Sequence, residues 1–504
     1  MTHSSLHASY QATPYPSRPV SLSHPDHLYV VGRLHGLTPA VVTGASVLEL
    51  GCGEGGNLLP MAATLPGAHF LGIDLAERQV GLARAAAQAA HLDNVEFRAG
   101  DALAVASSLV QAADGQGFDY IILHGLYSWV PLDVQAALLP LCRRLLADNG
   151  MIYISYNTYP GWHARGLVRE LMLRAGVTAV SQAERAAMAR AALDDLIPAY
   201  AQTGDGYATL LAEEKARVDK MEDGFLLHDL LEVENHPVYV DDFLARAGAA
   251  GLQFISEANV AASREENFSP EARRQLAAID QPVAREQQID FVLNRSFRQT
   301  VLCADGATVQ RRIDPGWLHD LYLASPVRPM GQDPKGAPGE AFFATPDGGR
   351  MGMTAPSAIA ALNHLALIWP DFMAFEALAE TVGDRAIVAQ LVIDLYPRNW
   401  LDLLPRPPAF AAAPGPRPMA TALARWQIQQ GEQVTDLRHR SVTITDIFTR
   451  QLLPLMDGQM DQGALMAALD GFETRDPALA ANADPAVLLD AVLQQLAARC
   501  LLVQ

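Results

Sequence analysis

The sequence predicts an α/β fold in which a largely parallel sheet is covered by helices on both faces. Five short apolar segments have the length of buried strands and lie at 46–50, 68–73, 95–98, 118–123 and 151–156. Helical patterns separate several of them, at 57–65, 77–90 and 133–146, and this alternation is typical of a parallel sheet. Two later strands are expected to join the same sheet after a helical insertion at about 163–250, and they lie at 252–256 and 296–302.

The second part of the chain is predicted to be mainly helical. Pro- and Gly-rich residues at 326–349 and proline-rich residues at 405–418 are expected to form linkers. Helices are expected at 355–368, 372–381 and 385–395, and the strand-then-helix pattern at 442–469 resembles a winged-helix module. The expected domains are therefore 1–305, a helical accessory domain at 306–415 and a helix-rich C-terminal domain at 416–504.

The charge balance narrows the possible partners. The chain carries 37 Lys and Arg residues against 56 Asp and Glu residues, a formal net charge of −19 at pH 7. Most of such a surface would repel nucleic acid, and no stripe of basic residues interrupts it, so we expect no nucleic-acid partner. The acidic surface suits a basic partner, such as a lysine-bearing protein segment, although it would also serve solubility alone.

The cysteines and histidines argue against a metal site. The four cysteines are too far apart in sequence for metal-ligand spacing or a disulfide framework, so a reducing cytoplasm is the expected compartment. The N-terminus lacks the pattern of a secretory signal, and no long apolar run predicts a membrane span. His24, His27, His228 and His236 have no expected role, and His439 is expected on the surface near a domain contact.

The first predicted strand ends in a glycine-rich turn within the segment VLELGCGEGGN, at 47–57. Glycines let the backbone turn sharply and let a ligand come close. The residues predicted to line a cofactor here are Gly51, Cys52, Gly53 and Asn57. Dinucleotide sites use a similar turn, with a pyrophosphate at the start of the following helix. Glu49, inside the strand end, would repel a pyrophosphate, but it suits the ammonium and sulfonium groups of S-adenosylmethionine.

Two further acidic residues follow the next two strands. Asp74, followed by Leu75, can accept hydrogen bonds from both ribose hydroxyls of an adenosine, although dinucleotide folds use the same position. Asp101, followed by Ala102, can accept a hydrogen bond from the adenine amino group, or it can cap a helix. Because three acidic strand ends accompany the glycine turn, we expect S-adenosylmethionine as cofactor and S-adenosylhomocysteine as its product.

The loops after the fourth and fifth strands are expected to frame the transferred methyl group. Their aromatic residues are Tyr127, Trp129, Tyr156, Tyr159 and Trp162. Aromatic faces attract an alkylammonium or sulfonium group, although some of these rings would serve packing alone. If the acceptor is an amine it must lose a proton, and the candidate proton acceptors are Tyr127, His124, Asn157 and His163. The predicted catalytic set is Tyr127, Asn157, His124, Trp129 and Trp162, with His124 also expected at the cofactor.

These motifs resemble the class I S-adenosylmethionine-dependent methyltransferases, and in particular a bacterial family that adds a methyltransferase regulatory domain. The resembling segments are Tyr15-Pro16, 48–62, 118–131, 155–163, 226–244 and 251–258. The resemblance implies a Rossmann-like, seven-stranded domain, a regulatory segment at about 220–300 and a place for Tyr15 at the cofactor. Some members are protein-lysine methyltransferases that act on outer-membrane proteins, which implies a protein substrate with accessible lysines and leaves a homodimer possible.

Three functions remain open at this point. The chain could methylate protein lysines, methylate a small molecule or natural product, or bind the cofactor without catalysis as a regulatory protein. Intact motifs argue against the last of these, and two large accessory regions argue mildly against a simple small-molecule enzyme. We expect the helical insertion and the C-terminal half to form the wall that selects the substrate.

Overall fold

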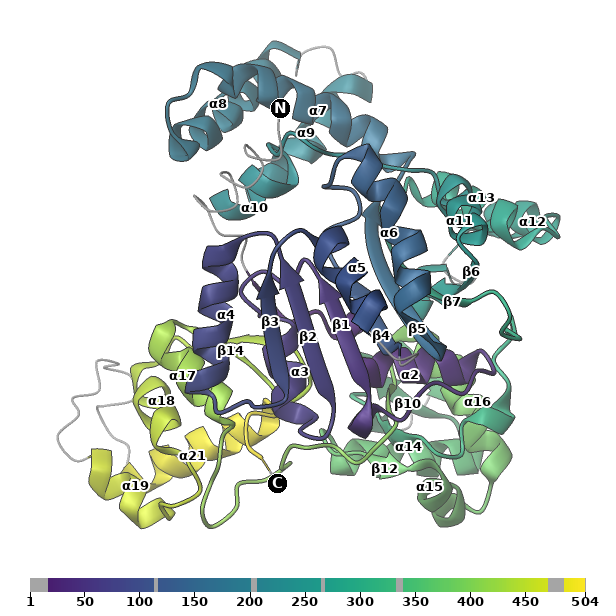
Figure 1. Cartoon of the computed structure of the whole chain (residues 1–504). Helices are drawn as coiled ribbons and strands as arrows, with labels where there is room; N and C mark the ends of the chain where they lie inside the picture. Colours follow the sequence, from purple (N-terminus) through teal and green to yellow (C-terminus); the bar gives the residue numbers. More distant parts are fainter. Residues whose placement is uncertain are drawn as a thin grey trace.

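One mixed sheet of seven strands, counted over the described residues, forms the centre of the protein (Figure 1). The computed structural model describes residues 17–112, 117–200, 206–263, 268–331, 339–469 and 485–503. The strands are β1 Ser46–Leu50, β2 His69–Asp74, β3 Val95–Ala99, β4 Phe118–Leu123, β5 Leu146–Asn157, β6 Leu252–Glu257 and β7 Phe297–Ala304. Their order is β3-β2-β1-β4-β5-β7-β6, with β7 antiparallel to both β5 and β6. The predicted α/β fold is confirmed.

Helices cover both faces of this sheet. They are α2 Pro25–Leu34, α3 Leu58–Thr64, α4 Glu77–Ala89, α5 Ala102–Ala112, α6 Leu132–Leu145 and α11 Val240–Ala249. On one face, α2, α3 and α4 share an apolar core with Val47 and Tyr120. On the other face, α5, α6 and α11 pack against Leu48 and Ile121. Successive strand side chains alternate between faces, so a sheet buried on both sides requires the near-continuous apolar strands seen in the sequence.

A bundle of four helices, counted over the described residues, stands above the carboxyl ends of the parallel strands (Figure 1). It contains α7 Gly161–Ala175, α8 Gln182–Tyr200, α9 Gly206–Val218 and α10 Asp223–Asp229. The bundle has an apolar core of its own, which includes Trp162, Met172 and Leu211. The helical stretch expected at about 163–250 thus divides into this bundle and α11, which packs against the sheet.

A buried ion cluster ties the next helices to the sheet. These helices are α12 Pro270–Ala277 and α13 Pro282–Leu293. Arg298 of β7 donates hydrogen bonds of 2.8 Å to Asp290 of α13 and to Glu257 of β6. Because a buried cation needs paired anions, this cluster holds α13 against the antiparallel edge of the sheet.

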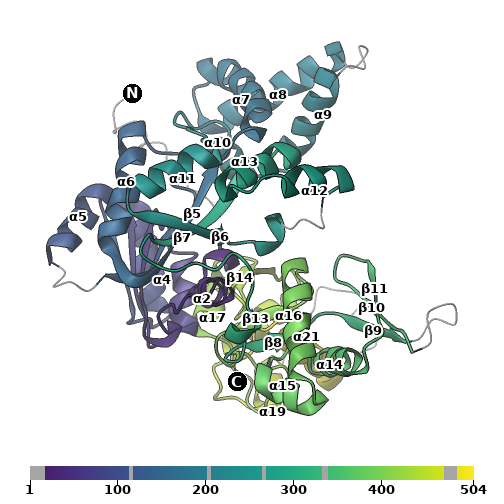
Figure 2. The same ribbon diagram turned by 90° about the vertical axis from the view of Figure 1, so that its right-hand side faces the viewer.

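The accessory region corrects one expectation. Its helices are α14 Pro356–Ile368, α15 Phe375–Val382 and α16 Arg385–Leu395, and its strands are β8 Tyr322–Ala324, β9 Arg328–Gly331, β10 Ala341–Ala344, β11 Arg350–Met353, β12 Met373–Ala374 and β13 Asp402–Leu404. The linker predicted at 326–349 is wrong, because β9, β10 and β11 form an antiparallel sheet that projects from the body (Figure 2). Gly348, in the turn between β10 and β11, has φ of +81°, and Phe343 of β10 is buried, so this glycine belongs to a turn between two short strands.

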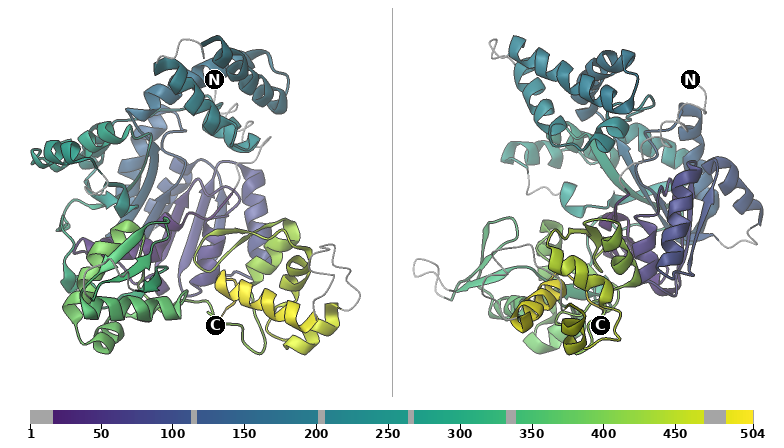
Figure 3. Two further views of the ribbon diagram at one scale, coloured as in Figure 1. Left: turned by 180° about the vertical axis from the view of Figure 1, so that it is seen from behind. Right: turned by 90° about the vertical axis from the view of Figure 1, so that its left-hand side faces the viewer.

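The C-terminal region lies beside the central sheet (Figure 3). It contains α17 Ala422–Gln430, β14 Gln433–Thr435, β15 Ser441–Thr443, α18 Ile447–Leu452, α19 Gln462–Leu469 and α21 Pro485–Ala498. Leu423 of α17 is buried in the same core as α3 and α4. His439, in the turn between β14 and β15, is only 5% exposed, so the expected surface position is wrong. The His439 side chain packs against the first domain, where it contacts Asn57. Among the described helices, none has the length and apolar character that a membrane crossing requires.

Candidate cofactor and active site

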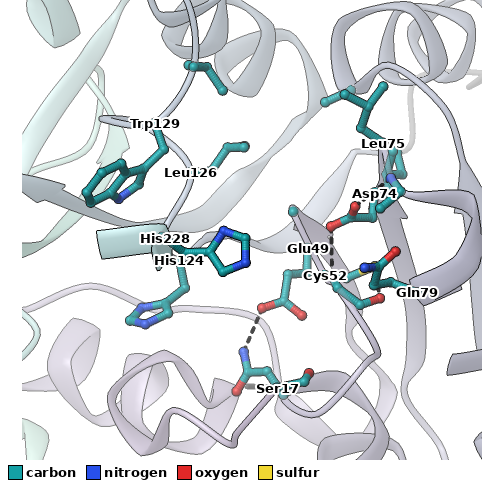
Figure 4. Close-up of a pocket in the computed structure, with 18 of the residues that line it drawn as sticks. Ser17, Glu49, Cys52, Asp74, Leu75, Gln79, His124, Leu126, Trp129 and His228 are labelled. Atoms are coloured by element: carbon teal, nitrogen blue, oxygen red, sulfur yellow. Dashed lines mark hydrogen bonds between the residues drawn. The ribbon is translucent and has the colours of Figure 1, made fainter. Parts of the chain in front are cut away.

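A cavity of about 320 Å³ lies where β1, β2, β3 and β4 end, covered by α10. Ligands of open α/β sheets bind beyond the carboxyl ends of the strands, so its place is that of a functional site. Figure 4 shows Glu49 between two walls, with Asp74 and Gln79 on one side and His124 and Trp129 on the other. The described residues that line the cavity all come from the first 229 positions, so the C-terminal half supplies none of this wall.

The glycine turn after β1 forms part of the cavity wall. Gly51, Cys52 and Gly53 line it, and the φ angles of Gly51 and Gly53 are +82° and +53°. The Gly51 N–H donates to the carbonyl of Ile73 at 2.8 Å, and the Gly53 N–H donates to the Asp74 carboxylate at 2.8 Å. Because residues other than glycine rarely adopt positive φ, these glycines allow the turn to lie against the end of β2.

The acidic ends of β2 and β3 face the same cavity, as do Leu75 and Ala102 beside them. Asp74 also accepts a 2.8 Å hydrogen bond from the Ala76 N–H, so it orders its own loop as well as the glycine turn. Burial raises the pKa of Asp74 above its usual value. Asp101 accepts a 2.9 Å hydrogen bond from the Ala104 N–H and thus caps α5 while it lines the cavity.

Glu49 is a buried carboxyl group at the cavity wall, 2% exposed. One carboxylate oxygen accepts a 2.8 Å hydrogen bond from the Asn57 side chain, and the other has no hydrogen-bond partner within the described ranges. Burial raises the pKa of Glu49 to about 8, opposed by the Asn57 hydrogen bond and reinforced by the charge of Asp74. An ammonium group would supply the missing donor and favour the ionised carboxylate, so the site fits the amino end of S-adenosylmethionine.

The loop after β4 brings two of the predicted catalytic residues, His124 and Trp129, to the cavity. The Nδ1 atom of His124 lies 3.0 Å from the Tyr153 hydroxyl, which orients the ring. Burial lowers the pKa of His124 to about 4, so the imidazole is uncharged at neutral pH. Trp129 contacts Trp162 edge-on, with ring centroids 6.2 Å apart.

The other predicted catalytic residues lie away from the cavity lining. Tyr127 is fully buried edge-on against the rings of Tyr156 and Phe243, where burial raises its pKa. The Asn157 side chain donates a hydrogen bond to Asn235, and Trp162 lies in the core of the helical bundle. The remaining alternatives lie elsewhere too: Tyr159 stacks on His163, which lies 3.0 Å from the Tyr239 hydroxyl. Tyr15 lies outside the described residues.

Sequence reasoning missed two segments that complete the cavity. Helix α10 contributes Phe225, His228 and Asp229, and the N-terminal residues before α2 contribute Ser17 and Arg18. No local motif marks these residues, since they reach the cavity only through the fold. The family resemblance at 226–244 contains His228, and it was the one signal that could have indicated this segment.

The N-terminal residues connect the glycine turn to α10. The Ser17 hydroxyl accepts a 2.8 Å hydrogen bond from the Gly56 N–H. Arg18 forms a 3.0 Å ion pair with Glu222, which precedes α10, and its guanidinium lies 5.2 Å from the centre of the Phe225 ring. The N-terminal residues thereby join the helical bundle to the glycine turn at the cavity.

Comparison with protein families finds three models in succession along the chain. A "Methyltransferase domain" matches residues 42–214, a "Predicted methyltransferase regulatory domain" matches residues 222–304, and "PKMT, C-terminal winged helix domain" matches residues 416–501. The predicted winged-helix character of the C-terminal region is therefore confirmed.

Two relatives are similar in sequence to large parts of the chain. An uncharacterised protein of Rickettsia prowazekii is 36% identical over 328 residues, which are 64% of this chain and 58% of that protein. A second is 33% identical over 240 residues, 47% of this chain and 93% of that protein. The chain thus spans just over half of the first relative and nearly all of the second.

A solved structure matches nearly the whole chain. It is PKMT2 from Rickettsia typhi in complex with AdoHcy, with a TM-score of 0.84 and 26% identity, covering 97% of this chain and 100% of that one. The methyltransferase family model and this match in complex with AdoHcy agree with the cofactor expected from the carboxyl groups and the glycine turn of the cavity. The chain belongs to the class I S-adenosylmethionine-dependent methyltransferases that carry a methyltransferase regulatory domain and a PKMT-type winged-helix domain.

Proposed function

We propose that this protein transfers methyl groups from S-adenosylmethionine to lysine side chains of a protein substrate. The observation that carries the proposal is the likeness to PKMT2, a protein-lysine methyltransferase by name, over 97% of the chain. A small-molecule enzyme needs little beyond the sheet domain, whereas here the regulatory and winged-helix domains are shared as well. The family resemblance favours a lysine-bearing protein of the outer membrane as the substrate class.

We assign the cofactor contacts to the strand ends. Glu49 would bind the ammonium group, Asp74 the ribose hydroxyls, and Asp101 with Ala102 the adenine ring. When bound, S-adenosylmethionine would supply a methyl group on a positively charged sulfur, and a nucleophile would attack the methyl carbon in line with the C–S bond, so that S-adenosylhomocysteine leaves. The glycine turn permits close approach of the ligand, and the Glu49 side chain in the cavity wall is only 2% exposed.

The acceptor amine would enter between the loop after β4 and α10. A free lysine has a pKa of about 10.4 and must lose its proton before it can attack. Burial beneath α10 would lower that pKa, and Trp129 can hold the ammonium form against its ring. His124 is uncharged, so it can accept a hydrogen bond from the amine without adding positive charge. His228 and Asp229 complete this side of the cavity.

Methyl transfer to an outer-membrane protein extract tests the proposal. We expect radiolabel from S-adenosylmethionine in protein bands of the untreated extract, and its loss when the lysines of the same extract are acetylated beforehand. Mass spectrometry should then place the added methyl groups on lysine Nζ. Equal labelling of the acetylated extract, or label confined to small solutes, would contradict a lysine acceptor.

Replacing Asp74 with alanine is expected to weaken S-adenosylhomocysteine binding by more than about tenfold, the scale of one hydrogen bond to a charged group. The substitution removes the proposed ribose acceptor and the hydrogen bond that holds the Gly53 N–H. Calorimetry measures the affinity. Asp119→Ala is a matched control, because Asp119 accepts a 2.8 Å bond from the Ser46 N–H at the start of β1 and β4, away from the cavity. Equal affinities of the two variants would refute the assignment of Asp74.

A further inference from the structure

The turn of the β14–β15 hairpin, residues 436–440, places His439 against the cofactor domain. His439 in this turn has φ +59° and is 5% exposed. Its Nε2 atom lies 2.8 Å from the Oδ1 atom of Asn57, which lines the cofactor cavity. A residue of the winged-helix domain therefore contacts Asn57, a residue of the cofactor cavity.

The hydrogen bonds around Asn57 determine the direction of this contact. The Val20 N–H lies 2.9 Å from Asn57 Oδ1, and because a backbone N–H can only donate, that atom must be the amide oxygen. The Asn57 amide nitrogen donates to Ser23 Oγ at 3.0 Å and to Glu49 Oε1 at 2.8 Å. His439 must then donate from Nε2. Burial lowers the pKa of His439 well below its usual value, so the ring is neutral and its Nδ1 carries no proton.

The hairpin holds His439 in place from both sides. The Asp436 carboxylate accepts hydrogen bonds from the Arg438 N–H at 3.0 Å and the Arg440 N–H at 2.8 Å, which closes the turn. Arg438 pairs with Asp402 at 3.0 Å, and its guanidinium lies 4.5 Å from the Trp369 ring centre in the accessory region. The left-handed backbone of His439 is strained for a residue other than glycine, so these contacts are needed to maintain it.

Packing alone does not account for a histidine at this position. The Nδ1 atom of His439 is buried without a hydrogen-bond partner within the described ranges, and such an atom destabilises the fold. The ring of His24 lies edge-on to the ring of His439, with centroids 5.0 Å apart. Because like charges so close together repel, the two rings could not both carry charge. A leucine would fill similar space without an unsatisfied nitrogen. The polar contact that the histidine does make is the one to Asn57.

We propose that His439 is a positioning residue of the cofactor site, which acts through the chain His439 Nε2–H to Asn57 Oδ1 and Asn57 Nδ2–H to Glu49 Oε1. Hydrogen bonds in series polarise one another, so the histidine strengthens the bond that Asn57 donates to Glu49. It also keeps the Asn57 amide in one orientation. The winged-helix hairpin thus helps to orient a side chain of the cofactor site in the same molecule. This inference rests on the assignment of Glu49 to the cofactor ammonium.

A matched pair of full-length variants tests the proposal. His439→Leu removes the donor, whereas His439→Gln retains an N–H at a similar reach, and the two side chains are equally unbranched at Cβ for the left-handed backbone. We expect His439→Leu to bind S-adenosylhomocysteine about tenfold more weakly and to shift the midpoint of its pH dependence upward, because Glu49 ionises less readily. His439→Gln should restore the affinity to within about threefold and restore the midpoint.

The outcomes separate the positioning role from the cofactor assignment. Wild-type affinity and an unchanged midpoint in a folded His439→Leu variant would overturn the positioning role alone. Failure of the wild-type protein to bind S-adenosylhomocysteine would overturn the cofactor assignment together with this inference. If His439→Leu does not fold, nitrogen NMR of histidine-labelled wild-type protein decides the question, with His439→Gln used to assign the signal. A proton on Nε2 is expected, and a proton on Nδ1 would refute the proposed hydrogen-bond chain.

Discussion

Replacing Gly53 with valine is expected to lower S-adenosylhomocysteine affinity by at least about a hundredfold while the protein remains folded. Gly53 has φ +53°, a conformation that a β-branched residue adopts only with strain. A Cβ atom at this position would meet nothing closer than the Ser17 hydroxyl at 3.9 Å, so the added side chain has room beside the cavity that Gly53 lines. The turn would also lose its 2.8 Å hydrogen bond to Asp74 if the backbone moved to relieve the strain. Calorimetry and circular dichroism measure affinity and fold.

Two further variants separate strain from general damage. Asn tolerates left-handed backbone, so Gly53→Asn should bind better than Gly53→Val but worse than wild type, since it still adds a side chain beside the ligand. Gly81→Val is the control, because Gly81 lies in α4 where a Cβ would meet nothing within 4 Å, and its affinity should stay within about twofold. Normal binding by Gly53→Val would mean that the turn does not hold the cofactor.

The sheet and its strand-end carboxyl groups could be predicted because their signals are local. An apolar segment of five residues followed by glycines defines β1 and its turn, and the observed bounds of β1, β4 and α16 coincide with the expected ones. A strand end brings its next residues to one edge of a parallel sheet whatever the rest of the chain does. For that reason the motif spacing alone was enough to place Glu49, Asp74 and Asp101 at one cavity.

The features that the sequence did not predict depend on contacts between segments that are far apart in the chain. The direction of a loop side chain is set by its neighbours, and Tyr127 turns inward because Tyr156 and Phe243 pack on it. No local motif at His228 or His439 indicates that the first reaches the cavity from α10 and that the second reaches Asn57 from the winged-helix domain. The strands β9, β10 and β11 have only four residues each in a segment rich in proline and glycine, and such a sequence is typical of a linker as well.

The pH dependence of cofactor binding is expected to follow the ionisation of Glu49. Its pKa is raised by burial to about 8 in the free protein, so at pH 7 about nine-tenths of the molecules carry a proton there. The ligand ammonium favours the carboxylate, so binding must release that proton. Affinity for S-adenosylhomocysteine should therefore rise with pH, by up to about tenfold per unit below pH 8, and level off near pH 8. Above about pH 8 the ligand amino group loses its own charge, and affinity should fall again.

The ionisation of Glu49 should also make the free energy of unfolding depend on pH. Because the pKa of Glu49 is raised in the folded free protein, its contribution is fully present below the unfolded value of 4.5 and is lost as pH rises through about 8. Bound ligand should reverse this trend, so the increase in melting temperature caused by S-adenosylhomocysteine should be larger at pH 8 than at pH 6. Thermal unfolding at saturating ligand measures the difference.

Glu49→Gln isolates the carboxyl group, because glutamine has nearly the same shape and can still accept the Asn57 hydrogen bond. At pH 8 this variant should bind about a hundredfold more weakly, the scale of losing a buried charge partner. Its affinity should no longer rise between pH 6 and 8, and its binding heat should no longer depend on the ionisation enthalpy of the buffer. Glu96→Gln, which removes a carboxylate outside the cavity lining, should behave as wild type. A rising limb that persists in Glu49→Gln would show that another group releases the proton and that Glu49 is not the ammonium partner.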